Sequence, residues 1–334
     1  MAWTWDFILQ AFKALGGAAE NITVRKGPAG ATIAAADPEK PVQLYAPENL
    51  LFPVSEVEVA GGRLKIKDAS SIGKGERSLF ENFYDSFAWS DRDREQAAAF
   101  LQAFDALPDE IHDALLDEFG AEIPAADSSD RVDLWLLQRR VLYWHGKPVL
   151  VPVLDLVGHD PKGLPYDETN GIFLSGTFAA EVHMQRKLLS PFGAFLRFGI
   201  ASPERAAFSL PMELNTEGGF HVVIDQSINL GARLGSIPVP VFKTEGRTVR
   251  FSCVMVGSSR NPRLSRGIFY RIMKDAGETK PDQVFDNILH INQMSFLKLL
   301  DALERYDGGM IPTLKKVAHL QLEAMTWCIG ARSI

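Results

Sequence analysis

Apolar residues recur at helical spacing in several stretches of the chain. In the first stretch they share one face of an expected helix over residues 3–15, which Gly16-Gly17 is placed to end. The residues on that face are Trp5, Ile8, Leu9, Phe12 and Leu15. Helical spacing returns at about 78–120, where Pro108 interrupts it, and over 131–145. The pattern therefore predicts a helical block between about 78 and 145.

Alternating apolar and polar residues flank this block. Residues 57–60 and 63–67 alternate on either side of Gly61-Gly62, a pattern typical of a hairpin with a two-residue turn. Residues 148–157 indicate a short buried strand that enters a loop. Residues 220–224 and 248–256 predict further strands.

Two amphipathic helices are expected at the end of the chain. Asp282 is placed to cap the first, and Pro312 lies near the start of the second. The predicted fold class is α+β, with a β-rich core of short strands, a helical insert and a helical C-terminal part. We expect residues 1–212 to form one domain, with the insert at about 78–145. Residues 213–334 would form a second domain of strands followed by the two helices.

Composition narrows the function classes. The 334 residues carry 35 Lys and Arg against 42 Asp and Glu, a formal net charge of −7, and 46% are hydrophobic, which excludes wholesale disorder. The acidic balance argues against a protein that coats nucleic acid. No secretory signal and no membrane segment are expected. Two cysteines, Cys253 and Cys328, are too few for a disulfide framework or a structural zinc site, so a reducing cytoplasm is the simplest compartment.

Charge is segregated along the chain. Residues 105–133 hold ten acids against one base, Arg131. They form either a solvated helical face or a wall that attracts a basic partner. Residues 243–274 hold eight bases against one acid, Glu245. Those bases either meet solvent and acids of the same chain, or they favour an acidic partner or self-association.

Common catalytic and metal-binding motifs are missing. Gly27-x-x-Gly30 lacks the GxGxxG spacing, and the segment after it is too short for a phosphate-binding helix. There is no HExxH, CxxC or GxSxG motif, and the seven histidines show no ligand spacing. No metal site is therefore expected.

Several segments, taken in order, carry a resemblance. They are Gly27-Pro-Ala-Gly30 with the alanine-rich run after it, Tyr45-Ala-Pro-Glu-Asn-Leu-Leu, Arg140-Val-Leu, residues 150–160 ending in Asp155-Leu-Val-Gly158-His159-Asp160, residues 178–186, and residues 190–200. Together they resemble the SET domain of protein lysine methyltransferases, especially the branch typified by the Rubisco large-subunit methyltransferase. The resemblance covers roughly residues 3–212.

The resemblance implies methyl transfer from S-adenosylmethionine (AdoMet) to a lysine amine. It implies that the cofactor is bound by Gly27, Gly30, Arg140, Gly158 and His159. Phe198 stands at the position of the family's catalytic tyrosine, and Arg186 stands at that of a second family tyrosine. The partner it implies is a basic, lysine-bearing protein or peptide, with no nucleic acid and no membrane.

The chain departs from the family at the residues that matter for chemistry. Gly158 replaces the asparagine that contacts the cofactor, and Phe198 has no hydroxyl with which to form a hydrogen bond. Arg186 would place a fixed positive charge where a sulfonium and a lysine should meet. The same block also has Pro191 and Ile200 in place of the family's Asn and Phe.

Three interpretations stay open. In the first, the chain is a working methyltransferase in which Tyr166 or Tyr143 supplies the missing hydroxyl. In the second, it is a SET-fold binding module for a protein or a small anionic ligand, and methyl transfer is lost. Arg186 would then hold an anion together with Arg139 or Arg140, or would form an ion pair with Asp155 or Glu181. In the third, the similarity is accidental on an unrelated α+β fold. The expectation is a SET-like protein whose activity is lost or altered.

Overall fold

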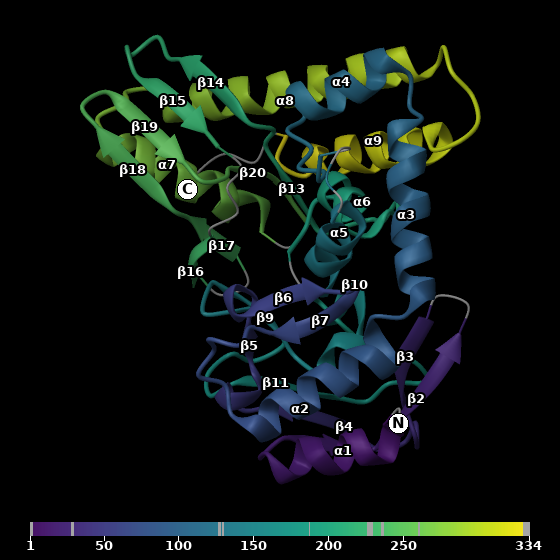
Figure 1. Ribbon diagram of the computed structural model, residues 1–334. Helices are drawn as coiled ribbons and strands as arrows, with labels where there is room; N and C mark the ends of the chain where they lie inside the picture. The colour runs from purple at the N-terminus through teal and green to yellow at the C-terminus, as the bar shows by residue number, and fades with distance from the viewer. Residues whose placement is uncertain are drawn as a thin grey trace. The chain divides into compact units, whose positions relative to one another are not determined.

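The chain divides into two compact units (Figure 1). The computed structural model describes residues 3–27, 30–125, 128, 130–186, 188–225, 230–234, 237–259 and 261–329, and of residues 230–234, 237 and 238 it describes only the backbone. Unit 1 comprises Met1–Leu101 and Pro124–Lys187, and unit 2 comprises Gln102–Ile123 and Leu188–Ile334. The domain boundary expected after residue 212 lies inside unit 2 and stays a prediction.

Unit 1 is built of short strands with a few helices. Its helical segments are α1 (Trp5–Ala14), η1 (Glu48–Leu50), η2 (Val54–Glu56), α2 (Lys74–Phe83), the π-helical turn η3 (Tyr84–Ala88), most of α3 (Asp91–Asp105), α5 (Arg131–Arg140) and η4 (Leu154–Leu156). Its strands are β1 (Ala18–Glu20), β2 (Ile22–Gly27), β3 (Gly30–Ala35), β4 (Val42–Ala46), β5 (Phe52–Pro53), β6 (Val57–Ala60), β7 (Arg63–Ile66), β8 (Leu142–Trp144), β9 (Lys147–Leu150), β10 (Gly158–Leu164), β11 (Ile172–Gly176) and β12 (His183–Met184).

The strands of unit 1 form small sheets. The orders are β1-β4-β11, β5-β9-β8, β2-β3, β6-β7 and β10-β12. All of these pairs are antiparallel except β10-β12, which is parallel. The backbone of Val182 connects two of the sheets, because its N–H donates to Ile33 in β3 and its carbonyl oxygen accepts from Gly158 in β10.

Unit 2 combines a four-stranded sheet with packed helices. Its helices are the end of α3, α4 (Asp109–Asp117), α6 (Pro191–Phe198), α7 (Pro262–Asp275), α8 (Pro281–Leu303) and α9 (Ile311–Thr326). Its strands are β13 (Ala206–Phe208), β14 (Met212–Asn215), β15 (His221–Ile224), β16 (Leu230–Leu234), β17 (Ile237–Pro240), β18 (Phe242–Glu245), β19 (Thr248–Phe251) and β20 (Met255–Ser258). The sheet orders are β14-β15-β19-β18, β13-β20 and β16-β17.

The α+β fold class predicted from the sequence is confirmed, and so are several of its elements. Helix α1 buries Ile8 and Phe12 completely. It ends where Gly16 adopts a φ of +92°. The hairpin β6-β7 forms with Gly61 and Gly62 at φ of +62° and +73°, the backbone that a type I′ turn requires. Residues 30–35 form a strand rather than a helix, which agrees with the rejection of a phosphate loop.

Two expectations about elements were wrong in detail, and one helix was missed. The helix expected over 131–145 ends at Arg140, because residues 142–144 form a hairpin with β9 around His145-Gly146, whose φ angles are +48° and +77°. The strand expected over 248–256 is broken at Ser252, whose backbone N–H and hydroxyl both bond to Val241. Helix α7 was not foreseen.

Asp282 does not cap α8. The N-cap of that helix is Lys280, and the Asp282 carboxylate instead accepts a 2.6 Å bond from Arg266 of α7. This ion pair ties the first turn of α8 to α7, which explains why an acid occupies that position. Among the helices that the structure describes, none is long and apolar enough to span a bilayer.

Candidate functional site

Four charged side chains from separate segments of unit 1 meet in one network. Arg186, just after β12, donates to Oδ1 of Asp155 at 2.8 Å and to the carbonyl oxygen of Arg140 at 3.0 Å. Arg140, at the end of α5, donates to Oδ1 of Asp93 at 2.9 Å and lies 3.5 Å from Oδ2 of Asp155. The side chain of Asp155 is fully buried. We call these four residues the Asp155 network.

The backbone around Asp155 is strained in a way that places the carboxylate. Val153, which is fully buried, has a φ of +70°, a value that a β-branched residue rarely adopts. This turn leads from β9 into η4, where the Asp155 N–H donates to the carbonyl oxygen of Val151. Strain of this kind persists only where the surroundings hold it, and here it delivers a buried carboxylate to two arginines.

Arg139 and Tyr84 lie beside the network. The Arg139 guanidinium stacks over Trp135 at 4.8 Å, and its burial, together with the positive charge of Arg140, lowers its pKa to about 10. Arg139 therefore stays charged at neutral pH. Tyr84 is completely buried in η3, and this burial, reinforced by the Asp155 carboxylate, raises the pKa of its hydroxyl well above the usual value. The sequence reasoning missed Tyr84, although it is the residue with a hydroxyl on an aromatic helical face formed by Phe80, Phe83 and Phe87.

Two of the predicted cofactor residues border this network. Gly30 has a φ of +109°, and a Cβ built on it would lie 3.4 Å from Oδ1 of Asp93. Gly27 pairs with Gly30 across the β2-β3 hairpin. The structure therefore brings Gly27, Gly30 and Arg140 together. Their assignment to a cofactor stays a prediction.

The surroundings of Gly158 explain why a glycine stands there. A Cβ at Gly158 would lie 2.7 Å from Cδ2 of His183, which is its register partner in β12. The asparagine found in the family has no room while His183 keeps this position. His159 is the next residue of β10 and pairs with Met184.

Tyr166 and Phe198 have other surroundings. The Tyr166 hydroxyl donates to the carbonyl oxygen of Tyr143 at 2.9 Å and accepts from the backbone N–H of Tyr143 at 3.4 Å, so it holds the backbone of β8. Phe198 belongs to unit 2, where it ends α6 before Gly199, which adopts a φ of +71°. A shared site for Phe198 and the residues of unit 1 stays a prediction.

Arg186 follows one of the alternatives drawn from the sequence. It pairs with Asp155, whereas Glu181 lies 3.5 Å from Nε2 of His183. Within unit 2, the bases of residues 243–274 also meet acids of the same chain. These ion pairs are Lys243–Glu245, Arg250–Asp225 at 2.8 Å, Arg266–Asp282 at 2.6 Å, Arg266–Asp286 at 2.7 Å and Arg271–Asp275 at 2.9 Å. Arg260 lies outside the described residues.

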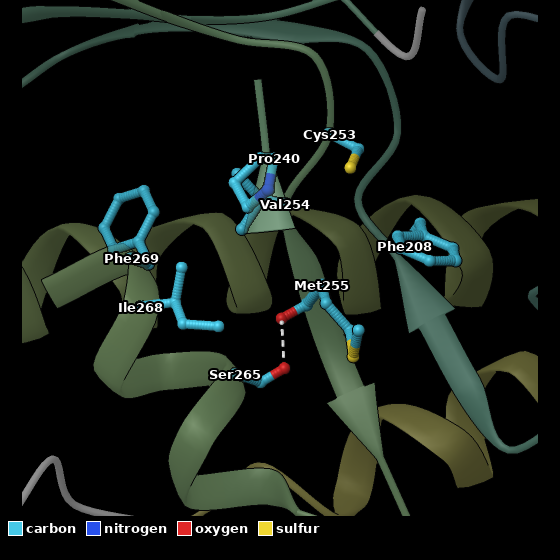
Figure 2. Close-up of a pocket in the computed structure, with 8 residues that line it drawn as sticks. All are labelled: Phe208, Pro240, Cys253, Val254, Met255, Ser265, Ile268 and Phe269. Carbon is cyan, nitrogen blue, oxygen red and sulfur yellow. Dashed lines mark hydrogen bonds between the residues drawn. The ribbon is translucent and has the colours of Figure 1, made fainter. Parts of the chain in front are cut away.

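The described residues include no group of three His, Cys, Asp or Glu side chains that could hold a metal ion. Cys253 and Cys328 are buried free thiols, and burial raises the pKa of Cys328 to about 11. Figure 2 shows a cavity in unit 2 between β20 and α7, lined by Met255, Ile268 and Phe269 among others. Its volume of about 20 Å³ has room for a water molecule rather than for a cofactor.

Comparison with known proteins returns solved structures only. No family model and no curated protein matches the chain. The chain is similar to the SET domain of LSMT bound to lysine and AdoHcy, with 11% identity over 98% of this chain and 91% of that chain and a TM-score of 0.41. It is similar to Rubisco LSMT bound to AdoMet, with 12% identity over 97% of this chain and 90% of that chain and a TM-score of 0.42. It is also similar to Rubisco LSMT bound to sinefungin and monomethyllysine, with 11% identity over 97% of this chain and 90% of that chain and a TM-score of 0.41.

These structures belong to the family that the sequence motifs resemble.

Proposed function

We propose that this chain is a SET-like protein that has lost methyl transfer and acts by binding a protein partner. The observation that carries this proposal is the ion pair between Arg186 and Asp155. Arg186 stands where the family has a tyrosine, and it is buried and bound at 2.8 Å to a fully buried carboxylate. Breaking a buried ion pair of this kind is costly, because it leaves an uncompensated charge.

The residues of the Asp155 network do not fit AdoMet as they stand. The cofactor carries a cationic sulfonium and a zwitterionic tail. Arg186 brings a guanidinium, paired with Asp155, to a position where the family has a neutral tyrosine. Arg140, one of the residues expected to bind the cofactor, already lies 2.9 Å from Asp93 and 3.5 Å from Asp155. An asparagine at position 158 would require the ring of His183 to move.

Three positions considered for orienting the lysine amine offer no suitable hydroxyl. Phe198 has none, and the Tyr166 hydroxyl is bonded to the backbone of Tyr143. Tyr84 does place a hydroxyl next to Asp155, but its side chain is completely buried. None of these three positions supports the alignment of amine and methyl group that the reaction requires.

Surface charge supports a basic partner. Asp109, Asp113 and Asp117 are exposed on helix α4 in unit 2, while Glu110 forms an ion pair with Arg305 at 3.1 Å. The solved structures similar to this chain include LSMT bound to lysine and to monomethyllysine. We propose that a lysine-bearing protein or peptide is the ligand that this chain has kept.

The test is a calorimetric titration with AdoMet, with AdoHcy and with a lysine-rich peptide, combined with an assay for label transfer from methyl-labelled AdoMet. We expect no AdoMet or AdoHcy binding up to about 1 mM, a concentration that would detect even weak complexes. Peptide binding should weaken between about 0.05 and 0.5 M salt, because the contacts are exposed.

A charge-matched pair of variants locates the peptide. Asp113→Asn with Asp117→Asn should reduce peptide affinity, whereas Glu39→Gln with Glu58→Gln in unit 1 removes the same charge from exposed positions and should not. Micromolar AdoMet binding or transfer of label to the peptide would overturn the loss of methyl transfer. Equal affinity of the two double variants would overturn the α4 surface as the binding site.

A further inference from the structure

Strand β18 forms an open edge of the four-stranded sheet in unit 2. It pairs with β19 through Phe242↔Phe251 to Glu245↔Thr248 and lies at the end of the order β14-β15-β19-β18 (Figure 1). Among the strands that the structure describes, none pairs with its other side. All four residues of β18 are exposed, and the exposed fraction of Phe242 is 48%. An exposed edge of this kind is a template for pairing with another strand.

The hydrogen bonds show which backbone groups face outward. The N–H of Ser252 donates to the carbonyl oxygen of Val241 at 2.9 Å, so the backbone polar groups of Val241 point toward β19. These groups alternate in direction along an antiparallel strand. The groups of Lys243 and Glu245 therefore also face β19, and those of Phe242 and Thr244 face the open side.

The order of side chains along β18 is complementary to itself. If two copies of β18 run antiparallel with Thr244 opposite Thr244, then Lys243 of each copy lies opposite Glu245 of the other. Opposite charges at directly facing positions stabilise a pair of strands.

We propose that β18 pairs with β18 of a second copy of this chain. The outward groups of Thr244 form the central pair of hydrogen bonds. The Lys243 and Glu245 side chains are 73% and 66% exposed and pair with each other within one chain, and in the dimer they exchange partners to form two ion pairs between the copies. A second copy fits better than an unrelated strand, because it supplies both opposite charges at the required spacing. The contact also covers Val241 and Phe242, which are apolar and about half exposed.

A proline substitution tests the backbone part. Thr244→Pro removes the outward N–H without breaking a bond of the β18-β19 ladder, so the fold should be kept while the pairing is lost. The matched control lies on the opposite edge of the sheet. The N–H of Thr216 donates to Phe220, so by the same alternation the groups of Glu213 in β14 face outward, and Glu213→Pro should leave the pairing intact.

Charge reversal tests the register. Lys243→Glu places two glutamates opposite each other in each half of the contact, whereas the double variant Lys243→Glu with Glu245→Lys restores opposite charges. Sedimentation equilibrium should show a dimer for the unchanged chain, for Glu213→Pro and for the double variant, and at least a tenfold weaker dimer for Thr244→Pro and for Lys243→Glu, as expected for about 1.4 kcal/mol.

Each other outcome overturns the proposal. An unchanged chain that stays monomeric up to about 1 mM has no such contact. A dimer that survives Thr244→Pro but is lost with Glu213→Pro uses the other edge. If the double variant dimerises no more tightly than Lys243→Glu, the register with Thr244 opposite Thr244 is excluded. Circular dichroism of each variant must match that of the unchanged chain, so that a loss of pairing is not a loss of folding.

Discussion

At the scale of single residues, Asp155 carries a negative charge in the interior of unit 1. Its carboxylate is completely buried and is the common partner of Arg140 and Arg186. Removing its charge would leave the buried Arg186 and the largely buried Arg140 close to each other, with Arg139 as a third positive charge nearby. The low effective dielectric constant of the interior makes such an arrangement costly.

We therefore expect Asp155→Asn to lower the free energy of unfolding of unit 1 by about 3–5 kcal/mol, as is usual when one partner of a buried ion pair is removed. Arg186→Gln should lower the free energy of unfolding by less, since Asp155 would still have Arg140 as a partner. Asp85→Asn is the control, because its bond to Arg63 at 3.0 Å lies at the surface and such pairs contribute about 0–1 kcal/mol. Denaturant titration measures all three. A loss for Asp155→Asn no larger than that for Asp85→Asn would contradict this account.

The sequence could indicate part of this site and no more. The motif order directed attention to Arg140, Gly158 and Arg186, and charge complementarity gave Asp155 as one of two partners for Arg186. The participation of Asp93 and Tyr84 depends on α3 and η3 approaching from elsewhere in the chain. No local pattern encodes that approach.

At the scale of elements, the start of α8 is fixed by a carboxylate that lies before the helix. Glu278 is 1% exposed and accepts from the Thr216 hydroxyl at 2.5 Å and from the Lys280 N–H at 2.9 Å. Burial alone would raise its pKa, but these hydrogen bonds, with those from Thr279, outweigh burial and lower the pKa below its usual value of 4.5. Glu278 thereby joins the β14-β15 turn to α8.

A lowered folded-state pKa means that the ionised form stabilises the fold. That stabilisation is present above pH 4.5 and is lost as the pH falls through the folded-state pKa. We expect Glu278→Gln to cost about 1–3 kcal/mol at pH 7, and the difference from the unchanged chain should shrink below pH 4.5. Glu217→Gln removes an exposed partner of Lys280 nearby and is the control. A difference that stays constant from pH 7 to pH 3 would contradict the role given to the Glu278 charge.

Elements were predictable from the sequence where their signals are local. Gly61-Gly62 specifies its hairpin, and the apolar spacing of residues 5–14 specifies α1. The prediction of a helix up to residue 145 was wrong because His145-Gly146 forms a turn. This dipeptide indicates a turn less clearly than Gly61-Gly62 does. Asp282 was misread as a cap because its partner, Arg266, lies 16 residues earlier on a helix that the pattern did not reveal.

At the scale of the whole molecule, each of the two units has a core of its own. Unit 1 buries Phe12, Phe80 and Trp135, while unit 2 buries Phe119, Phe285 and Phe296. The tryptophans are divided unequally. Trp3, Trp5, Trp89, Trp135 and Trp144 belong to unit 1, and Trp327 belongs to unit 2. Tryptophan fluorescence therefore follows mainly unit 1, and circular dichroism is weighted toward the long helices α7, α8 and α9 of unit 2.

We expect urea unfolding followed by these two probes to give transitions that do not coincide, as separate cooperative units require. The variants above then act selectively. Asp155→Asn should move the fluorescence transition to lower urea and leave the dichroism transition almost in place, and Glu278→Gln should do the reverse. Trp327→Phe removes the remaining tryptophan signal of unit 2 and should leave the fluorescence midpoint unchanged. If both probes trace one transition that both variants shift equally, the chain unfolds as a single cooperative unit. The free energy that couples the two cores would then exceed the stability of either core alone.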